Sequence, residues 1–171
     1  MWLRCLLMSF IFAVSNISEL SPRELHELYK LRTDVFVVEQ QCPYEEIDHI
    51  DPLSTTLHVR AFETGQPNQI LGTARVFPDQ VDGREVTKLG RFVLKPSHRG
   101  TGLGAELMIN ALRLAFEREP MRAVWIAAQE PLKGYYEQFG FEQCGELFDD
   151  AGMAHVPMLL SERKLAAMFS D

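Results

Sequence analysis

Cysteine, positive charge and long apolar runs are all scarce in this chain of 171 residues. The three cysteines are widely spaced and form no Cys-x-x-Cys or Cys/His pattern, so neither a disulfide framework nor a metal site is expected. A reducing, cytoplasmic setting is the simplest interpretation. The net charge of −7 argues against a protein that binds nucleic-acid phosphates, and weakly favours cationic or amine-bearing small partners.

The apolar stretch at the N-terminus, residues 6–14, is too short to cross a bilayer as a helix, and no membrane association is expected. With Arg4 before it and Ala13 and Ser15 at its end, it resembles a short secretory signal, and cleavage after Ser15 would give a secreted protein. The alternative, which we favour, is a first β-strand over residues 9–15. Residues 1–8 would then be a loose or non-native extension, with Met8 as an alternative start.

The remaining pattern predicts a single α/β domain over residues 1–171. Helical spacing with proline and glycine signals predicts helices at 21–36, 102–118, 131–140 and 161–170. Alternating or continuous apolar runs predict strands at 9–15, 56–63, 70–77, 85–94, 123–129, 141–148 and 155–160. Because the two kinds of element do not alternate strictly, we expect a mixed sheet rather than a doubly wound parallel one.

Residues 99–104 read Arg-Gly-Thr-Gly-Leu-Gly, between a predicted strand and a predicted helix. Such a loop can point successive backbone N–H groups at an anion, its glycines let oxygens approach, and the helix N-terminus adds partial positive charge. Arg99 could add a forked charge. A tight turn with incidental glycines is an equally weighted interpretation of the hexapeptide alone. The pattern lacks the Lys-Ser or Lys-Thr of a P-loop and the later acid of a dinucleotide-binding fold.

Three stretches together make the sequence recognisable. Arg99-x-x-Gly102-x-Gly104 after GRFVLKP, followed further along by YYEQFGF, resembles the GNAT superfamily of N-acetyltransferases. LRTDVFVVEQQCPYEEID, residues 31–48, resembles the signature of its ElaA-like subgroup. The matches extend over residues 18–158. The resemblance implies a mixed, mostly antiparallel central sheet of six to seven strands flanked by helices, with two central strands splayed to admit acyl-CoA.

The resemblance also implies roles for individual residues. The pyrophosphate of acetyl-CoA, the cosubstrate, would lie on the glycine loop, and its pantetheine arm would pair with the strand before it. Tyr136 matches the tyrosine that protonates the departing thiolate, and Gln129 stands where relatives often have a pantetheine-binding Asn. The implied cosubstrate-binding residues are Phe92, Val93, Leu94, Arg99, Gly100, Thr101, Gly102, Leu103, Gly104, Ala105, Gln129 and Tyr136.

The sequence offers several candidates for the base that takes a proton from the incoming amine. Many relatives place a Glu on the strand before the loop, where this chain has Lys88 and Arg91. Glu39 and Glu45 are the favoured candidates, and the other candidates are Glu46, Asp48, Asp51, His58 and His155.

Each of these assignments has a plainer alternative. The acidic loop, residues 39–51, is equally well interpreted as a solvated surface. A structural role is the favoured interpretation of His155, and a pair with an acid is that of Arg32.

The sequence therefore predicts a cytoplasmic N-acetyltransferase that moves acetyl from acetyl-CoA to a primary amine by direct attack. The acceptor would be a small-molecule or peptide amine, no nucleic acid is expected as a partner, and a homodimer is an option because relatives often dimerise. The alternative is a catalytically silent, CoA-binding regulatory module. The missing Glu on the central strand favours that alternative, whereas Tyr136 and the intact glycine loop oppose it.

Overall fold

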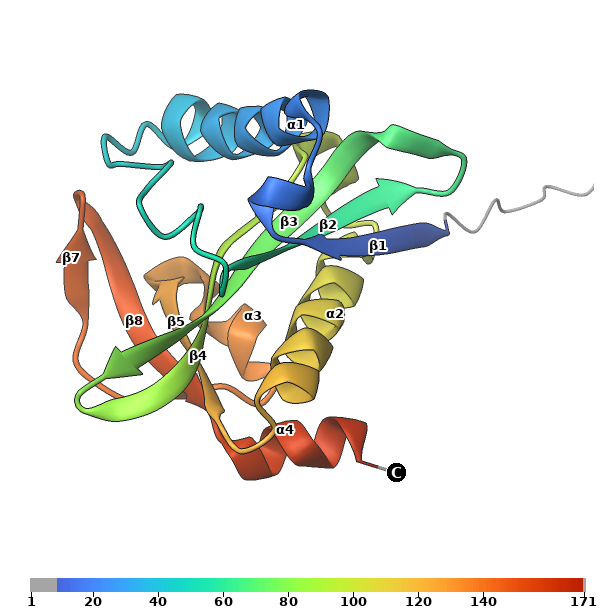
Figure 1. Ribbon diagram of the computed structural model, residues 1–171. Coiled ribbons are helices and arrows are strands. Elements are labelled where there is room, and N and C mark those ends of the chain that lie inside the picture. The colour runs from blue at the N-terminus through green and yellow to red at the C-terminus, as the bar shows by residue number, and fades with distance from the viewer. Residues whose placement is uncertain (1–8, 171) are drawn as a thin grey trace, which may run out of the picture.

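Eight strands form one open sheet in the computed structural model, which describes residues 9–170 (Figure 1). The strands are β1 Phe10–Ser15, β2 Leu57–Glu63, β3 Gln66–Val81, β4 Arg84–Leu94, β5 Ala123–Gln129, β6 Glu142–Gln143, β7 Phe148–Asp150 and β8 Met153–Leu160. Their order across the sheet is β1-β2-β3-β4-β5-β8-β6, and β7 also pairs with β8. Only β4 and β5 are parallel, so the expected mixed and mostly antiparallel sheet is confirmed.

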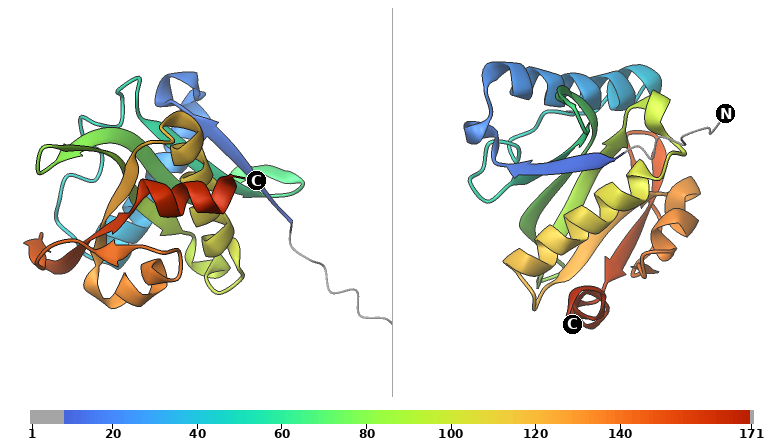
Figure 2. Two further views of the ribbon diagram at one scale, coloured as in Figure 1. Left: turned by 90° about the horizontal axis from the view of Figure 1, so that it is seen from below. Right: turned by 90° about the vertical axis from the view of Figure 1, so that its right-hand side faces the viewer.

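The helices cover both faces of this sheet. They are α1 Pro22–Arg32, α2 Leu103–Arg118, α3 Lys133–Glu137 and α4 Glu162–Phe169. The right-hand view of Figure 2 shows α2 crossing one face of the strands. Neighbouring β2 residues point to opposite faces: Ala61 joins the core beneath α2, and Phe62 joins a second core with Leu28 of α1. The alternation of β2 thus supplies both cores.

Helix α1 starts where the sequence predicts and ends differently. Ser21 accepts a hydrogen bond from the backbone of Glu24, whose side chain reaches back to Ser21, and Pro22 occupies the first turn. The predicted end near residue 36 is wrong, because the chain continues into a π-helical turn, Thr33–Glu39. π-Helical turns widen a helix and are frequent at functional sites.

The central strands part after a short contact. β4 pairs with β5 only through residues 86–88 and 123–125, although β4 continues to Leu94 and β5 to Gln129. Throughout the diverging stretch β5 keeps its antiparallel pairing with β8. The predicted splay is therefore present, and within the described residues the edge of β4 from Leu89 onward has no strand beside it on the β5 side.

The sheet has eight strands rather than six or seven because the predicted strand at 141–148 divides into β6 and β7. Opposite the break lies Pro157 of β8, which has no backbone N–H to donate to a neighbouring strand. The Cys144 N–H still donates to the Pro157 carbonyl at 2.9 Å, and a Cβ on Gly145 would lie 3.0 Å from the proline ring. Between β6 and β7 the chain therefore packs closely on Pro157 and does not form a continuous hydrogen-bond ladder with β8.

The strand alternative for the N-terminal apolar stretch is confirmed as β1, which pairs with β2 along its whole length. The expected loose extension, residues 1–8, lies outside the described part of the chain. Among residues 9–170, no helix is both long and apolar enough to cross a bilayer. In the same residues, no group of three or more His, Cys, Asp or Glu side chains is arranged to hold a metal ion.

Candidate functional site

A cavity of about 450 Å³ opens where β4 and β5 part. One wall comes from these strands and α3 and includes Gly90, Phe92, Ile126, Gln129 and Tyr136. A second comes from the π-helical turn and the loop after it, with Phe36, Gln40, Cys42, Tyr44 and Asp48. The remaining wall carries Asp79, Lys88, Trp125, Phe148, Asp150 and His155. The splay therefore leads into a polar and aromatic pocket large enough for a small molecule.

The glycine loop at the start of α2 is open to a ligand. Gly100 and Gly102 have φ of +75° and +90°, and a Cβ at either position would meet nothing within 4 Å. Gly102 is the N-cap of α2, so no side chain caps the first N–H groups of this 16-residue helix. The fully buried side chain of Leu103 anchors the turn. An anion such as a pyrophosphate fits this arrangement of free N–H groups and bare backbone.

Arg99 of the same loop is engaged by an acid. Its guanidinium donates to both carboxylate oxygens of Glu39, at 2.8 and 3.1 Å, and both side chains are nearly half exposed. Glu39 ends the π-helical turn, and the next residue, Gln40, accepts a hydrogen bond from Gln129 at 3.0 Å. The end of the π-helical turn therefore contacts two residues predicted to bind the cosubstrate.

Strand β4 carries a bulge beside the cavity. The register with β3 shifts between Thr73 and Arg75, and on β4 Arg91 adopts a left-handed φ of +49°. Its side chain holds this strained backbone in place, with ion pairs to Glu46 at 3.0 Å and Asp48 at 3.3 Å. Such strain persists only where surrounding contacts enforce it, and it is common at functional sites.

Tyr136 combines burial with access to the cavity. Its side chain is only 8% exposed, and its ring packs edge-on against Phe92 and Phe141. Burial raises the pKa of the Tyr136 phenol, so its hydroxyl keeps its proton at neutral pH and can donate it. The neighbouring Tyr135 differs, because its hydroxyl is buried against Gly104 and is not among the groups that line the cavity.

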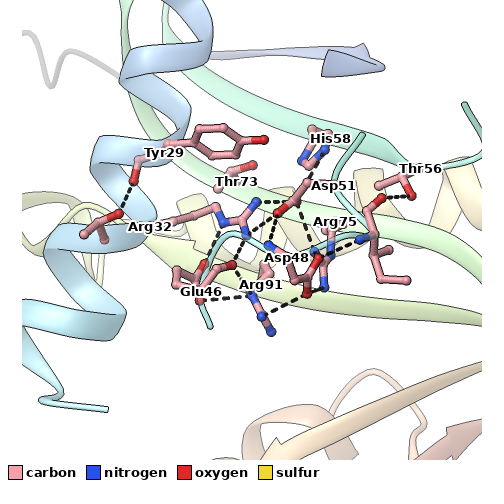
Figure 3. Close-up of polar contacts among 12 residues, drawn as sticks. Tyr29, Arg32, Glu46, Asp48, Asp51, Thr56, His58, Thr73, Arg75 and Arg91 are labelled. Atoms are coloured by element: carbon pink, nitrogen blue, oxygen red, sulfur yellow. Dashed lines mark hydrogen bonds and ion pairs between the residues drawn. The ribbon is translucent and has the colours of Figure 1, made fainter. Parts of the chain in front are cut away.

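The acidic loop is not a solvated surface, because a buried ion network binds it (Figure 3). Fully buried Arg32 donates to Glu46 at 2.6 Å and to Asp51 at 2.7 Å, which confirms the expected pairing of this arginine with an acid. Arg75 of β3 donates to Asp48 at 2.7 Å and to Asp51 at 3.0 Å. The network thus joins α1, the loop and the central strands.

The two titratable groups at the centre of this network respond differently to burial. Burial opposes ionisation of Asp51, but the hydrogen bond and charge of Arg32, with the charge of Arg75, prevail and lower its pKa to about 2. Burial lowers the pKa of His58 to about 4, outweighing the Asp51 carboxylate 3.8 Å away. His58 is therefore a neutral core residue and does not reach the cavity wall.

The cavity is lined by three of the residues predicted to bind the cosubstrate and by neither favoured base. Phe92, Gln129 and Tyr136 line the cavity, whereas Glu39 and Glu45 are absent from the described lining. Glu39 pairs with Arg99, and Glu45 is exposed and contributes only its carbonyl to Arg91. The pocket carboxylates Asp79 and Asp150 were missed, because no sequence signal places them at the cavity.

A splayed pair of parallel strands and an uncapped helix N-terminus are both present, as the resemblance implies for a transferase that works on acyl-CoA. The sequence comparison agrees with this resemblance. A model of the acetyltransferase (GNAT) domain family matches residues 20–162, and the chain belongs to that family.

Among its relatives are a UPF0039 protein of Mycobacterium tuberculosis, 40% identical over 142 residues, and the ElaA protein of Escherichia coli, 33% identical over 141 residues. These alignments cover 82% of the chain, with 86% and 90% of the respective relatives. Similar solved structures include an acyl-CoA N-acyltransferase from Pseudomonas aeruginosa, with TM-score 0.80 and 34% identity over 90% of this chain and all of that one. E. coli ElaA follows with TM-score 0.78 and 30% identity, over 88% of this chain and 99% of that one. The ElaA-like character read from the sequence is confirmed.

Proposed function

We propose that the protein is an N-acetyltransferase that moves acetyl from acetyl-CoA to a primary amine by direct attack. One observation carries the proposal: the edge of β4 that no strand among residues 9–170 pairs with runs from the cavity to the open glycine loop at the start of α2. A pantetheine arm can extend β4 as an added strand while its pyrophosphate lies on residues 99–105. The acyl group would then lie beside Tyr136.

Acetyl transfer by direct attack requires few protein groups. The amine nitrogen attacks the thioester carbon, and backbone N–H groups of the β4 bulge are suited to bind the oxyanion that forms. The C–S bond then breaks, and the hydroxyl of Tyr136 protonates the departing thiolate. Gln129 would hold the pantetheine once its bond to Gln40 is exchanged. The acceptor is a small-molecule or peptide amine, and the demand for acetyl-CoA supports a cytoplasmic setting. A homodimer is an option.

Tyr136→Phe separates this proposal from the silent, CoA-binding module. Loss of the proton donor is expected to lower the transfer rate by about 100-fold or more, while acetyl-CoA binding stays within about twofold of the wild type. The measurement is release of free CoA thiol from acetyl-CoA with a panel of primary amines and peptides. Tyr135→Phe is the matched control on the same helix, and we expect it to retain the rate within about threefold. A wild type that binds acetyl-CoA yet transfers nothing would support the module.

Glu39→Gln tests whether the carboxylate on Arg99 competes with the cosubstrate. An exposed ion pair is worth about 0.2–1 kcal/mol, so its removal should tighten acetyl-CoA binding by up to about fivefold. The measurement is calorimetric titration, with Glu45→Gln as the control. If Glu39 were instead the base, binding would not change and the transfer rate would fall by about 100-fold.

A further inference from the structure

We propose that His155 is the base of the reaction, and that its Nε2 takes the proton from the incoming ammonium. This inference rests on the proposed function and adds the one role that the favoured carboxylates do not fill. His155 lies on β8, lines the cavity and is half-buried. In the antiparallel ladder it stands directly opposite Gln129 of β5, so the two side chains share one face of the sheet.

The hydrogen bonding of the imidazole determines which nitrogen is free. Nδ1 lies 2.8 Å from the backbone carbonyl of Met153. A carbonyl oxygen can only accept, so Nδ1 carries the hydrogen and Nε2 of the neutral ring carries the lone pair. No hydrogen bond within residues 9–170 engages Nε2. The ring of Phe148 stacks on the imidazole, with the two ring centroids 5.7 Å apart, and limits rotation of the imidazole. This is a base with a fixed tautomer and an available lone pair.

The carboxylates near the cavity are less suited to this task. Asp48 accepts from Arg75 at 2.7 and 2.9 Å and pairs with Arg91. Asp79 accepts from Lys88 at 3.0 Å and from the backbone of Gln80 at 2.8 Å, and these hydrogen bonds, with the lysine charge, outweigh burial and lower the pKa of Asp79. Both are thus poor proton acceptors at neutral pH.

Asp150 shares the wall and is the nearest rival. The side chain of Asp150 is exposed, whereas His155 is half-buried and its ring is positioned by contacts with Met153 and Phe148. The other ionisable side chains on the cavity wall are Cys42, Tyr44, Asp48, Arg75, Asp79, Lys88, Arg91 and Tyr136. Burial raises the pKa of Tyr44, so its hydroxyl also keeps its proton. The network fixes the charge of the arginines and Asp48, and burial keeps Tyr136 protonated, so the imidazole of His155, with the lone pair on Nε2, is the group on this wall suited to accept the proton.

The proton balance closes with two groups. The acceptor enters as R–NH3⁺, and Nε2 of His155 takes one proton, which later passes to solvent. The amine forms the C–N bond, the C–S bond breaks, and Tyr136 gives its proton to the thiolate. The second proton that leaves the nitrogen restores the Tyr136 hydroxyl. The products are the amide, CoA thiol and one proton in solution.

The first experiment compares wild type, His155→Gln and the exposed-histidine control His26→Gln between pH 5.5 and 9. Acetyl-CoA is the donor, benzylamine is the acceptor that enters as an ammonium, and methoxyamine is the acceptor that is already neutral. We expect kcat/KM with benzylamine to fall about 100-fold in His155→Gln, and the acidic limb of its pH profile to change. With methoxyamine, kcat/KM of His155→Gln should fall by less than about fivefold, because this amine needs no deprotonation before attack. Equal losses with both acceptors, or an unchanged pH profile, would overturn the proposal.

A second measurement needs no acceptor. The ¹⁵N spectrum of the histidine rings, with His155→Gln to assign the signal, should show the hydrogen of His155 on Nδ1 at pH 7.5. A hydrogen on Nε2 would contradict the proposal. Calorimetric titration with acetyl-CoA accompanies both measurements. If the wild type does not bind acetyl-CoA, the proposed function itself is overturned. If His155→Gln binds acetyl-CoA and transfers acetyl at the wild-type rate, only the role of His155 is overturned.

Discussion

Gly102→Glu is expected to weaken acetyl-CoA binding by more than about 100-fold, or about 2.7 kcal/mol. A side chain at this N-cap would occupy the open space in front of the first N–H groups of α2, and its negative charge would repel a pyrophosphate. Calorimetric titration with acetyl-CoA and with desulfo-CoA measures the effect. Micromolar binding by the wild type that vanishes in the variant would support a cosubstrate site on residues 99–105.

The control variant for Gly102→Glu should place the same negative charge on an equally strained glycine that lies outside the glycine loop. Gly83, in the turn between β3 and β4, has a φ of +77° and equally open surroundings. Gly83→Glu should therefore bind acetyl-CoA like the wild type. Equal binding by both variants and the wild type would show that the glycine loop is only a turn, and the enzyme proposal would lose its main support.

Arg32→Met is expected to lower the free energy of unfolding by about 3–5 kcal/mol. The substitution removes one of the two arginine partners of each buried carboxylate, because Glu46 keeps only Arg91 and Asp51 keeps only Arg75. A buried charge that loses a partner costs several times what an exposed pair contributes. For a chain of this size the midpoint of thermal unfolding should fall by about 6–20 °C. Urea unfolding, followed by circular dichroism, measures the free energy.

Lys30→Met is the matched control on the same helix. Lys30 pairs with Asp34 one turn away, and both side chains are more than half exposed. Loss of this pair should cost less than about 0.5 kcal/mol. A similar small cost for Arg32→Met would mean that the buried network contributes little to stability.

Local signals in the sequence predicted the elements that short-range chemistry determines. Ser21 and Glu24 mark the start of α1 because a capping box forms within four residues. The glycine loop was recognised from residues 99–104, and the helix after it was predicted from the helical spacing of its apolar residues. The splay of β4 and β5 came from the resemblance to relatives and not from residue patterns.

Contacts between distant segments could not be predicted in the same way. The pairing of Arg99 with Glu39 joins residues 60 positions apart, and no local pattern reports it. The division of the predicted strand at 141–148 depends on Pro157, which lies on a different strand.

The sequence by itself determined the family, the glycine loop, the tyrosine on α3 and the class of reaction to expect, because those features are stretches of neighbouring residues. Only the tertiary structure decided which ionisable groups are free to react. It buried the acidic loop against Arg32 and Arg75, engaged Glu39 with Arg99, and left Nε2 of His155 without a partner among the described residues. The availability of a charge or a lone pair depends on what lies within a few ångströms of it, and in a folded chain those neighbours come from anywhere in the sequence.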